Sequence, residues 1–451
     1  MKIDLPREVA LKILYDINEK GAYSNISINK YFEGYELRDI DKAFITELVY
    51  GAVKWRLSID WIIQQFSSVK LRKISPWILN VLRLGVYQLL YTDKIPESAA
   101  CNESVALARR YGHSASSGFV NAILRNIGRS REKIKYPEKD KDVVQYLCVK
   151  YSHPDWMVKA WLDRFGEEFT EKLLESNNQV PDFSVRVNTL KVTREQLIEH
   201  LISIGIEAEE GKYLEEAVVI RNPSSISKLD AFKNGWIQVQ DESSMLVARV
   251  LDPKPGELVI DVCSAPGGKS THIAQLMDNR GTVVSRDIHE HKIRLIEDSI
   301  KRLELSIIRT EVFDATRLDD SFIEKADRVL VDAPCTGLGI IRRKPDIKWA
   351  RNIEDKKEIT ELQTNILNIA SKYVKTGGVL VYSTCTLEPE ENDFIVKEFI
   401  SKNREFELED ISALLPNKLV KPSSREGFIQ LFPNTDDIDG FFIAKMKKRG
   451  K

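Results

Sequence analysis

The spacing of hydrophobic residues changes along the chain and divides it into three parts. In residues 1–135, apolar side chains recur every three or four positions, for example over 43–53, which predicts helices. The stretch 77–91 is apolar nearly all round, which predicts a buried central helix. Ser75 as an N-cap and Pro76 at the first helical position would begin it. This first part is predicted to be an all-helical domain.

The middle part, residues 136–240, combines two kinds of spacing. It begins in a charged linker, after which residues 143–175 return to helical spacing. Residues 183–190 then alternate between apolar and polar, as in a strand. Arg186 and Asn188 are polar positions within that strand, which we interpret as a solvated sheet face, with contact to RNA as the alternative. Linker helices followed by a small α/β subdomain are predicted here.

In the last part, residues 241–451, short apolar runs alternate with helical segments, as in an α/β domain with a parallel, Rossmann-like sheet. Ligands in such sheets bind outside the carboxyl ends of the strands, so these ends are the predicted site. The runs that we predict as strands are 258–262, 282–285, 308–313, 328–331 and 379–382.

The loop after the strand 258–262 reads Cys-Ser-Ala-Pro-Gly-Gly-Lys over residues 263–269. Its glycines let the backbone approach a ligand, and the following helix offers unpaired N–H groups. A Walker A loop would need glycine where Cys263 stands, and the G-x-G-x-x-G pattern is absent. Asp287 lies 20 residues after Gly267, where a doubly wound sheet holds ribose hydroxyls. A nucleoside ligand is predicted, without a requirement for a triphosphate.

Charge and composition narrow the possible partners. The net charge is −1, but residues 1–135 carry 21 Lys and Arg against 14 Asp and Glu, a net of +7. Such a basic module suggests a nucleic-acid partner, and a solvated helical surface is an equal alternative. The five cysteines show no C-x-x-C spacing, so neither zinc nor a disulfide framework is indicated. No apolar stretch approaches the ~18 residues of a membrane helix, and we expect a soluble, cytoplasmic monomer without a metal.

Two cysteines and three acids fall at the predicted carboxyl edge of the sheet. Singly, each could be a capping aspartate or a small buried cysteine, but together they indicate a site. A thiolate that adds to carbon-6 of cytosine would activate carbon-5 toward a methyl group from S-adenosylmethionine, and Asp332 could hydrogen-bond near nitrogen-3. The strand-end residues are Asp287, Asp314, Asp332-Ala333-Pro334-Cys335 and Ser383-Thr384-Cys385-Thr386.

These motifs resemble those of RNA cytosine-5 methyltransferases. Residues 41–51 and 119–125 resemble the RNA-binding antitermination factor NusB, and the whole arrangement resembles the RsmB/Sun family, which carries a NusB-like domain ahead of a Sun-type methyltransferase domain. The likeness covers essentially the whole chain. It implies domains at 1–135, 136–240 and 241–451. Further stretches that match are 152–156, 342–349 and Glu390-Glu391-Asn392.

The resemblance implies roles for individual residues. Asp287 would hold the ribose, Asp314 would lie near the adenine, and Asp332 would contact the target base and the cofactor's surroundings. Cys385 would be the nucleophile, and Cys335 would assist proton removal and product release. The S-adenosylmethionine loop would be Cys263, Ser264, Ala265, Pro266, Gly267, Gly268 and Lys269. A basic run suited to RNA would comprise Arg342, Arg343, Lys344, Lys348, Trp349 and Arg351.

The implied function is methylation of carbon-5 of one cytosine in small-subunit (16S) ribosomal RNA, with the base leaving its stack. Another RNA such as tRNA is an alternative substrate. A nicotinamide-dependent oxidoreductase would share the loop and the ribose acid, but it has no need of two strand-end cysteines. An RNA-binding scaffold would not need Cys385, Cys335 and Asp332 intact. In DNA cytosine-5 methyltransferases the cysteine after proline is the nucleophile, so the choice of Cys385 over Cys335 depends on the resemblance.

Overall fold

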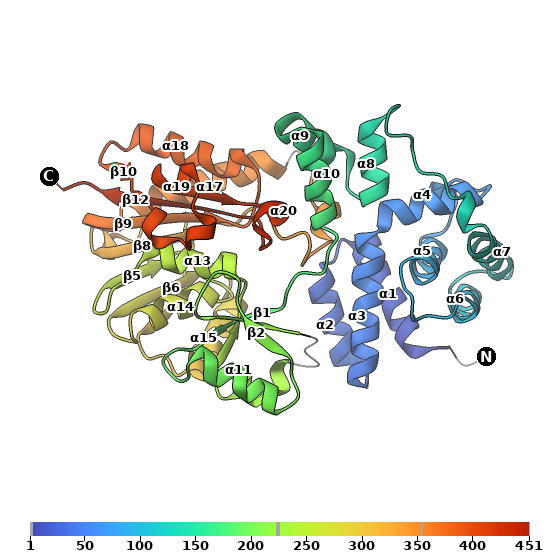
Figure 1. The fold of residues 1–451 in the computed structure, drawn as a ribbon, viewed down its shortest axis with the longest axis horizontal. Helices are drawn as coiled ribbons and strands as arrows, with labels where there is room; N and C mark the ends of the chain where they lie inside the picture. The colour runs from blue at the N-terminus through green and yellow to red at the C-terminus, as the bar shows by residue number, and fades with distance from the viewer. Residues whose placement is uncertain (1–2, 222–225, 353–354, 451) are drawn as a thin grey trace. The chain divides into compact units, whose positions relative to one another are not determined.

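A computed structural model describes residues 3–221, 226–352 and 355–450. The chain divides into two compact units (Figure 1). The helical unit comprises residues 1–179 together with 341–352, and the sheet unit comprises residues 180–340 and 353–451. The helices α8–α10 thus belong with the preceding helices, whereas the sequence pattern grouped them with the small α/β subdomain in residues 136–240.

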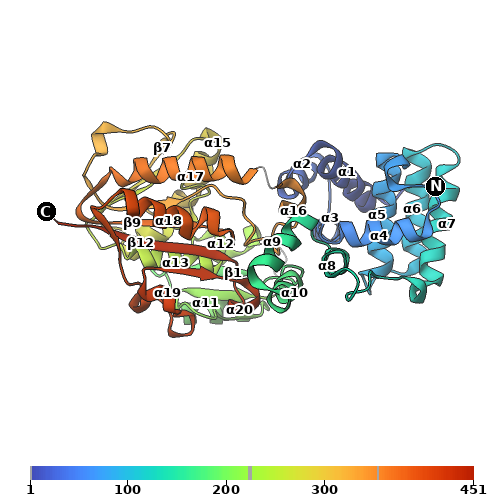
Figure 2. The ribbon, with the colours of Figure 1, turned by 90° about the horizontal axis from the view of Figure 1, so that it is seen from above.

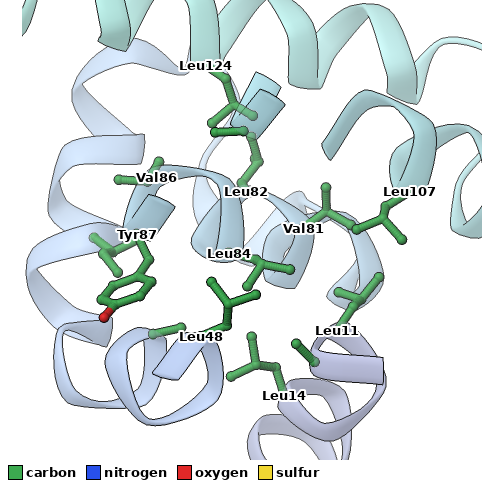
Figure 3. Packing of buried hydrophobic residues seen from close by; sticks show 14 of the residues in the cluster. Leu11, Leu14, Leu48, Val81, Leu82, Leu84, Val86, Tyr87, Leu107 and Leu124 are labelled. Carbon is green, nitrogen blue, oxygen red and sulfur yellow. The ribbon is translucent and has the colours of Figure 1, made fainter. Parts of the chain in front are cut away.

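The helical unit is built around α5, as the apolar pattern predicted. Val81, Leu82 and Leu84 of this helix have no exposed surface and pack against leucines of the surrounding helices (Figure 3). The helix begins at Pro76, although the Ser75 side chain makes no capping hydrogen bond. The helices are α1 (Leu5–Lys20), α2 (Ser24–Gly34), α3 (Asp39–Lys54), α4 (Arg56–Phe66), α5 (Pro76–Leu90), α6 (Glu97–Tyr111), α7 (Ser116–Arg129), α8 (Val143–Tyr151), α9 (Asp155–Phe165), α10 (Glu167–Ser176) and α16 (Ile347–Ala350).

A small antiparallel sheet begins the sheet unit. Its strand order is β2-β3-β1-β4, and Val185 and Val187 of β1 pack against Leu197 and Leu201 of α11. Thr193 caps α11 in the expected capping box with Gln196. The small α/β subdomain is thereby confirmed. Its elements are β1 (Ser184–Val187), α11 (Arg194–Ser203), β2 (Ala208–Glu210), β3 (Ala217–Ile220), α12 (Asp230–Lys233) and β4 (Ile237–Val239).

The large sheet carries the predicted strands side by side. Its order is β10-β12-β9-β8-β5-β6-β7, with β11 paired to β12. The strands are β5 (Leu258–Asp261), β6 (Thr282–Asp287), β7 (Ile308–Val312), β8 (Ala326–Asp332), β9 (Val374–Thr384), β10 (Phe406–Leu408), β11 (Phe428–Leu431) and β12 (Phe441–Lys448). The longer helices beside it are α13 (Glu242–Leu251), α14 (Gly268–Leu276), α15 (Glu290–Leu303), α17 (Asp355–Ser371) and α18 (Asp393–Lys402).

Both faces of the large sheet are covered, which explains the continuous apolar runs of its strands. Val259 of β5 packs in one core with residues of α13 and α14, and its neighbour Ile260 packs in a second core with residues of α17 and α18. Figure 2 shows α13 and α18 on opposite sides of the strands. None of the helices formed by the described residues combines the length and apolar composition needed to cross a membrane.

The sheet is mixed rather than purely parallel, which corrects the sequence prediction. Five strands, β5 to β9, run parallel in the predicted way, but β12 lies antiparallel beside β9. The C-terminal strands β10, β11 and β12 were missed because β12 pairs antiparallel with all its neighbours, so its pairing carries none of the strand–helix–strand alternation that indicates a parallel strand.

Candidate active site

The carboxyl ends of the parallel strands lie at one edge of the large sheet, as the alternating pattern predicted. The pairs Asp261–Ser285, Asp261–Leu330 and Asp332–Ser383 are in register, so the ends of β5, β6, β8 and β9 are neighbours. The ends of these four strands and the loops that follow them contain every predicted strand-end residue except Asp314, which follows β7. The chemistry-bearing side chains are thus brought to one edge.

The turn after β5 needs glycine at one position. Gly267 has φ +95°, and a Cβ there would lie 3.0 Å from the Ile296 side chain. It is the N-cap of α14, and its N–H donates to Ser264 O at 2.7 Å. Ser264 is held in turn by its Oγ, which donates to Arg286 O at 2.9 Å. The turn is therefore fixed by its own backbone and by the neighbouring strand β6.

Arg186 of the small subdomain also holds this turn. Its side chain is fully buried, Nη1 donates to Gly268 O at 2.7 Å, and Nη2 donates to Thr271 Oγ1 at 3.0 Å. Asn188 is buried as well, and its Nδ2 donates to Gly235 O at 2.9 Å. The interpretation of Arg186 and Asn188 as a solvated face, and the alternative of contact with RNA, are both wrong. An alternating pattern shows which positions share a face, and the face here packs against α14 and α15, where Arg186 contacts Gly268 O and Asn188 contacts Leu303 O.

One pocket of about 420 Å³ opens at the carboxyl edge of the large sheet. The predicted residues that line it are Cys263, Ala265, Asp287, Asp314, Asp332, Cys335 and Cys385. Ser264, Pro266, Gly267, Gly268 and Lys269 are not among its lining residues. These five shape the turn behind the pocket wall or, in the case of Lys269, contact a residue that lines it.

Two of the lining carboxylates are oriented by the loops that follow them. Asp287 is 8% exposed, and its Oδ1 accepts the backbone N–H of His289 at 3.0 Å. Asp314 Oδ1 accepts the N–H and Oγ1–H of Thr316 at 2.9 and 2.7 Å. The side-chain and backbone hydrogen bonds from Thr316 lower the pKa of Asp314. Both acids can offer carboxylate oxygens to hydroxyl or N–H donors of a ligand.

Asp332 forms a fixed pair with Lys269. Lys269 Nζ lies 2.7 Å from Asp332 Oδ2, and Ser383 Oγ donates to Asp332 Oδ1 at 2.8 Å. The ammonium also lies 5.0 Å from the centre of the Phe441 ring. Because both carboxylate oxygens are held, the Asp332 side chain has a single orientation at the pocket wall.

The two strand-end cysteines touch. Cys335 Sγ and Cys385 Sγ are 3.3 Å apart, and both side chains line the pocket. The hydrogen bond with Cys385 raises the pKa of Cys335 well above its usual value, and burial and the charge of Glu391 act in the same direction. Cys335 therefore keeps its proton more readily than an ordinary thiol. Either sulfur can be the donor in this contact.

Part of the predicted RNA-binding run is buried. Lys348 has no exposed surface, and its Nζ donates to Lys54 O at 2.9 Å and Ser152 O at 2.7 Å. Burial lowers the pKa of Lys348 well below its usual value. An RNA phosphate cannot reach this ammonium, so the prediction is wrong for Lys348. One of the two carbonyl acceptors of Lys348, Ser152 O, belongs to residues 152–156, another stretch that resembles the family.

The neighbours of Lys348 share this environment to different degrees. Trp349 Nε1 donates to Val53 O at 2.8 Å, and the Arg56 guanidinium lies 4.7 Å from the centre of the tryptophan ring. The Trp349 ring therefore packs within the helical unit instead of offering a stacking face to RNA. Arg342 is 6% exposed. Of the run, Lys344 is exposed and stays a predicted RNA contact, as do the half-exposed Arg343 and Arg351.

Several pocket residues were missed by sequence reasoning. Ile288 and His289 follow Asp287 directly, so inspection of the residues after each strand end would have found them. Phe313 and Thr316 flank Asp314 in the same way. Leu362 and Ile366 lie on α17, where helical apolar spacing gives no sign that a side chain faces a ligand pocket. No group of three or more His, Cys, Asp or Glu side chains in the described ranges is arranged to hold a metal ion.

A glycine turn, strand-end carboxylates and a mixed Rossmann-like sheet define the sheet unit as a nucleoside-binding α/β domain, and the adjoining strand-end cysteines favour a methyltransferase of this fold. Comparison with known proteins is consistent with that class. Residues 248–447 match the family model described as 16S rRNA methyltransferase RsmB/F, residues 4–129 match the NusB family, and residues 153–227 match the ferredoxin-like domain of the RsmF/B-like methyltransferases.

Whole-chain relatives lead to the same assignment. The chain is 42% identical over 452 residues, covering 100% of both proteins, to "Probable ribosomal RNA small subunit methyltransferase B" of Bacillus subtilis (strain 168). It is 32% identical to the ribosomal RNA small subunit methyltransferase B of Serratia proteamaculans (strain 568), covering 91% of this chain and 92% of that protein. The chain belongs to the RsmB/F family of ribosomal RNA small subunit methyltransferases, as the sequence resemblance indicated.

Solved structures extend the similarity to three dimensions. The crystal structure of PH0851 matches with a TM-score of 0.83 at 29% identity, covering 99% of this chain and 100% of that chain. NSun6 from Pyrococcus horikoshii, solved with SFG, matches with a TM-score of 0.60 at 27% identity, covering 66% of this chain and 99% of that chain. The predicted fold, a NusB-like helical domain, a small α/β subdomain and a Rossmann-like methyltransferase domain, is confirmed.

Proposed function

We propose that this chain transfers a methyl group from S-adenosylmethionine to carbon-5 of one cytosine in small-subunit ribosomal RNA, through a covalent adduct on Cys385. The observation that carries the proposal is the contact of Cys335 and Cys385 at 3.3 Å in the same pocket as Asp287 and Asp314. One pocket thus joins groups suited to a nucleoside with a thiol pair suited to a pyrimidine ring.

The pocket residues fit S-adenosylmethionine. The volume of about 420 Å³ lies within the ~300–1,000 Å³ usual for small-molecule sites. Asp287 can accept both ribose hydroxyls, Asp314 can accept an adenine N–H donor, and the apolar Ile288 and Phe313 can flank the base. NSun6, a structural relative of this chain, was solved with SFG, an analogue of S-adenosylmethionine. When bound, the sulfonium supplies an electrophilic methyl group.

Replacing Asp287 with alanine should weaken binding of S-adenosylmethionine. The missing charge-assisted hydrogen bond is worth roughly 1.5–3 kcal/mol, or about 10- to 150-fold in Kd. Isothermal titration calorimetry on the full chain measures this directly. The control is Asp298→Ala, which removes an exposed carboxylate from α15. Equal affinity in Asp287→Ala and the parent protein would remove Asp287 from the ribose site.

The chain's own residues can carry out the covalent steps in order. The Cys385 thiolate adds to carbon-6 of cytosine, which makes carbon-5 nucleophilic, and Asp332 with Lys269 stabilises charge at the ring edge. After methyl transfer, solvent water takes the carbon-5 proton, the electron pair of that bond restores the double bond between carbon-5 and carbon-6, and Cys385 leaves carbon-6 as a thiolate. Cys335, protonated 3.3 Å from Cys385, donates a hydrogen bond to the departing sulfur and so aids this elimination. The assignment of Cys385, rather than Cys335, as the nucleophile follows from the resemblance of the motifs to those of the family.

The helical unit is proposed to bind the RNA backbone. Its first 135 residues carry a net charge of +7, and residues 4–129 match the NusB family. The relatives are named as methyltransferases of small-subunit ribosomal RNA, which supports that RNA as the substrate. We further propose that the enzyme acts as a monomer in the cytoplasm, where that RNA is assembled into subunits.

Removing exposed cations from the helical unit should weaken RNA binding in a salt-dependent way. We expect the triple variant Lys70→Ala, Arg72→Ala and Lys73→Ala to lower RNA affinity and to reduce the slope of log K against log salt by about 1 for each phosphate that is no longer neutralised. Filter binding of 16S RNA at several salt concentrations gives the slope. The control is Lys397→Ala with Lys402→Ala, which removes two exposed cations from α18 in the sheet unit. Identical slopes in the triple variant and the control would move the RNA site to another surface.

The choice of substrate separates this proposal from its alternatives. Bisulfite sequencing of ribosomal RNA and tRNA from a strain that lacks the protein should show one 16S cytosine losing its protection. Loss of protection only in tRNA would indicate the tRNA methyltransferase, and no loss would favour an RNA-binding scaffold.

A further inference from the structure

The stretch Glu390-Glu391-Asn392 matches the family, but neither the cofactor nor the cysteine chemistry above gives it a role. It follows β9 and lies between Cys385 and α18. The Glu391 side chain has no exposed surface, and Asn392 is 1% exposed. A carboxylate buried to this degree is costly unless donors surround it, so its partners show what it supports.

The donors around Glu391 come from the residue that follows Cys335 and from α17. Thr336 N donates to Glu391 Oε2 at 2.9 Å, and Thr336 Oγ1 donates to Glu391 Oε1 at 2.5 Å. Gln363 Nε2 on α17 donates to the same Oε2 at 2.9 Å and to Pro334 O at 2.9 Å. The residues on both sides of Cys335 are therefore linked to the Glu391 carboxylate. Thr336 is hydrogen-bonded to it directly, and Pro334 is linked to it through Gln363.

The turn that holds Cys385 is tied to the same group. Thr386 Oγ1 lies 2.7 Å from Thr336 Oγ1 and 3.5 Å from Glu391 Oε1. Asn392 Oδ1 accepts Thr384 Oγ1–H at 2.5 Å, and its Nδ2 donates to Thr386 O at 3.2 Å. Glu391 and Asn392 thus hold the residues before and after Cys385, and Glu391 holds those around Cys335.

We propose that Glu391 and Asn392 are positioning residues that hold the two cysteine turns together, so that the Cys335 and Cys385 sulfur atoms stay in contact. The functional weight of this inference rests on the proposed roles of the two cysteines. The side chains of Glu391 and Asn392 do not line the pocket, so neither touches the substrate or the cofactor. They act through the backbone and side chains of Thr336, Thr384 and Thr386.

The charge of Glu391 adds to its geometric role. It is one of the causes that raise the pKa of Cys335, which keeps that sulfur protonated beside Cys385. Burial raises the pKa of Glu391 itself, and the hydrogen bonds from Thr336 and Gln363 oppose this rise. The same hydrogen bonds that place the turns therefore also favour the charged form of the buried carboxylate.

The contact between the sulfurs can be measured without RNA or S-adenosylmethionine. Diamide takes two electrons and two protons from a pair of adjoining thiols, which form a disulfide while diamide becomes the hydrazine. The rate of the Cys335–Cys385 disulfide, followed by mass spectrometry of peptides from the full-length protein, reports how often the sulfurs meet. Loss of methyltransferase activity alone would not change this rate.

Two substitutions at Glu391 separate hydrogen bonding from charge. Glu391→Ala removes all acceptors, and a displacement of the turns by about 1 Å should slow disulfide formation by at least tenfold. Glu391→Gln keeps one oxygen for Thr336 N and Gln363 Nε2 and turns its amide nitrogen toward the threonine hydroxyls, so we expect a rate within about threefold of the parent. The control is Glu390→Gln, whose side chain lines a separate hollow between α17 and α18.

Further measurements distinguish positioning from general destabilisation. The Kd of S-adenosylhomocysteine should stay within about twofold in all variants, because Asp287 and Asp314 are untouched. If Glu391→Ala does not fold, Thr336→Val removes one donor at constant volume and should slow the disulfide at least threefold, an effect of about one hydrogen bond. Disulfide formation at the parent rate in Glu391→Ala, or in Thr336→Val, would overturn the proposal. So would an equal loss in Glu391→Gln and Glu391→Ala.

Discussion

The Cys335→Ala variant is expected to leave RNA covalently attached to the protein, whereas Cys385→Ala leaves the RNA free. Cys385 forms the bond to carbon-6, so its removal should lower methylation by at least ~10³-fold. Cys335 lies 3.3 Å from Cys385 and keeps its proton, so its removal should stop elimination after the adduct has formed. Denaturing gels of each variant with RNA and S-adenosylmethionine detect the adduct as a shifted band.

The double variant Cys335→Ala with Cys385→Ala is the control for this experiment. It should bind RNA without any shifted band, since neither thiol of the pair remains to form the bond. Both single variants should bind S-adenosylmethionine, because the carboxylates of the pocket are unchanged. A shifted band from Cys385→Ala but not from Cys335→Ala would exchange the roles of the two cysteines.

Replacing Asp332 with asparagine should lower the single-turnover rate of methylation by about 10²- to 10³-fold. The carboxylate is held by Lys269 Nζ at 2.7 Å and by Ser383 Oγ at 2.8 Å, and asparagine keeps the shape while removing the charge. The Lys269 ammonium then loses its partner, and the ring edge loses the fixed charge pair that stabilises the adduct. Rapid-quench kinetics with saturating S-adenosylmethionine measure the step.

Asp320→Asn is the matched control, because this aspartate is exposed and lies in the turn before β8. Its rate should equal that of the parent protein. Calorimetry on Asp332→Asn should show binding of S-adenosylmethionine close to that of the parent. If Asp332→Asn methylated RNA at the parent rate, the Lys269–Asp332 pair would be a structural bridge without a part in the reaction.

At the carboxyl edge of the large sheet, the alternation of strands and helices was sufficient to predict which residues lie together. Alternating strands and helices indicate parallel strands, and parallel strands bring their carboxyl ends together. Asp287, Asp314, Asp332, Cys335 and Cys385 could therefore be grouped from the amino-acid sequence, and the pocket contains them all. Their individual roles stay predictions, since the pocket geometry shows which groups meet and not which step each performs.

The failures share one cause, which is that sequence patterns do not reveal long-range partners. Lys348 resembles an RNA contact because it stands in a basic run, yet its acceptors are the carbonyls of Lys54 and Ser152. Arg186 resembles a solvated strand residue, yet it binds Gly268 O across the subdomain boundary. A lysine or arginine looks the same in the sequence whether its side chain contacts water, an RNA phosphate or a buried carbonyl oxygen.

The most direct test of the proposed function is the identity of the methylated nucleoside. The purified full-length protein is incubated with unmethylated 16S ribosomal RNA and isotopically labelled S-adenosylmethionine, and the RNA is digested and analysed by mass spectrometry. We expect the label in 5-methylcytidine, at one position, and absent when Cys385→Ala replaces the parent protein. Label in any other nucleoside, or undiminished 5-methylcytidine with Cys385→Ala, would contradict cytosine methylation through a Cys385 adduct.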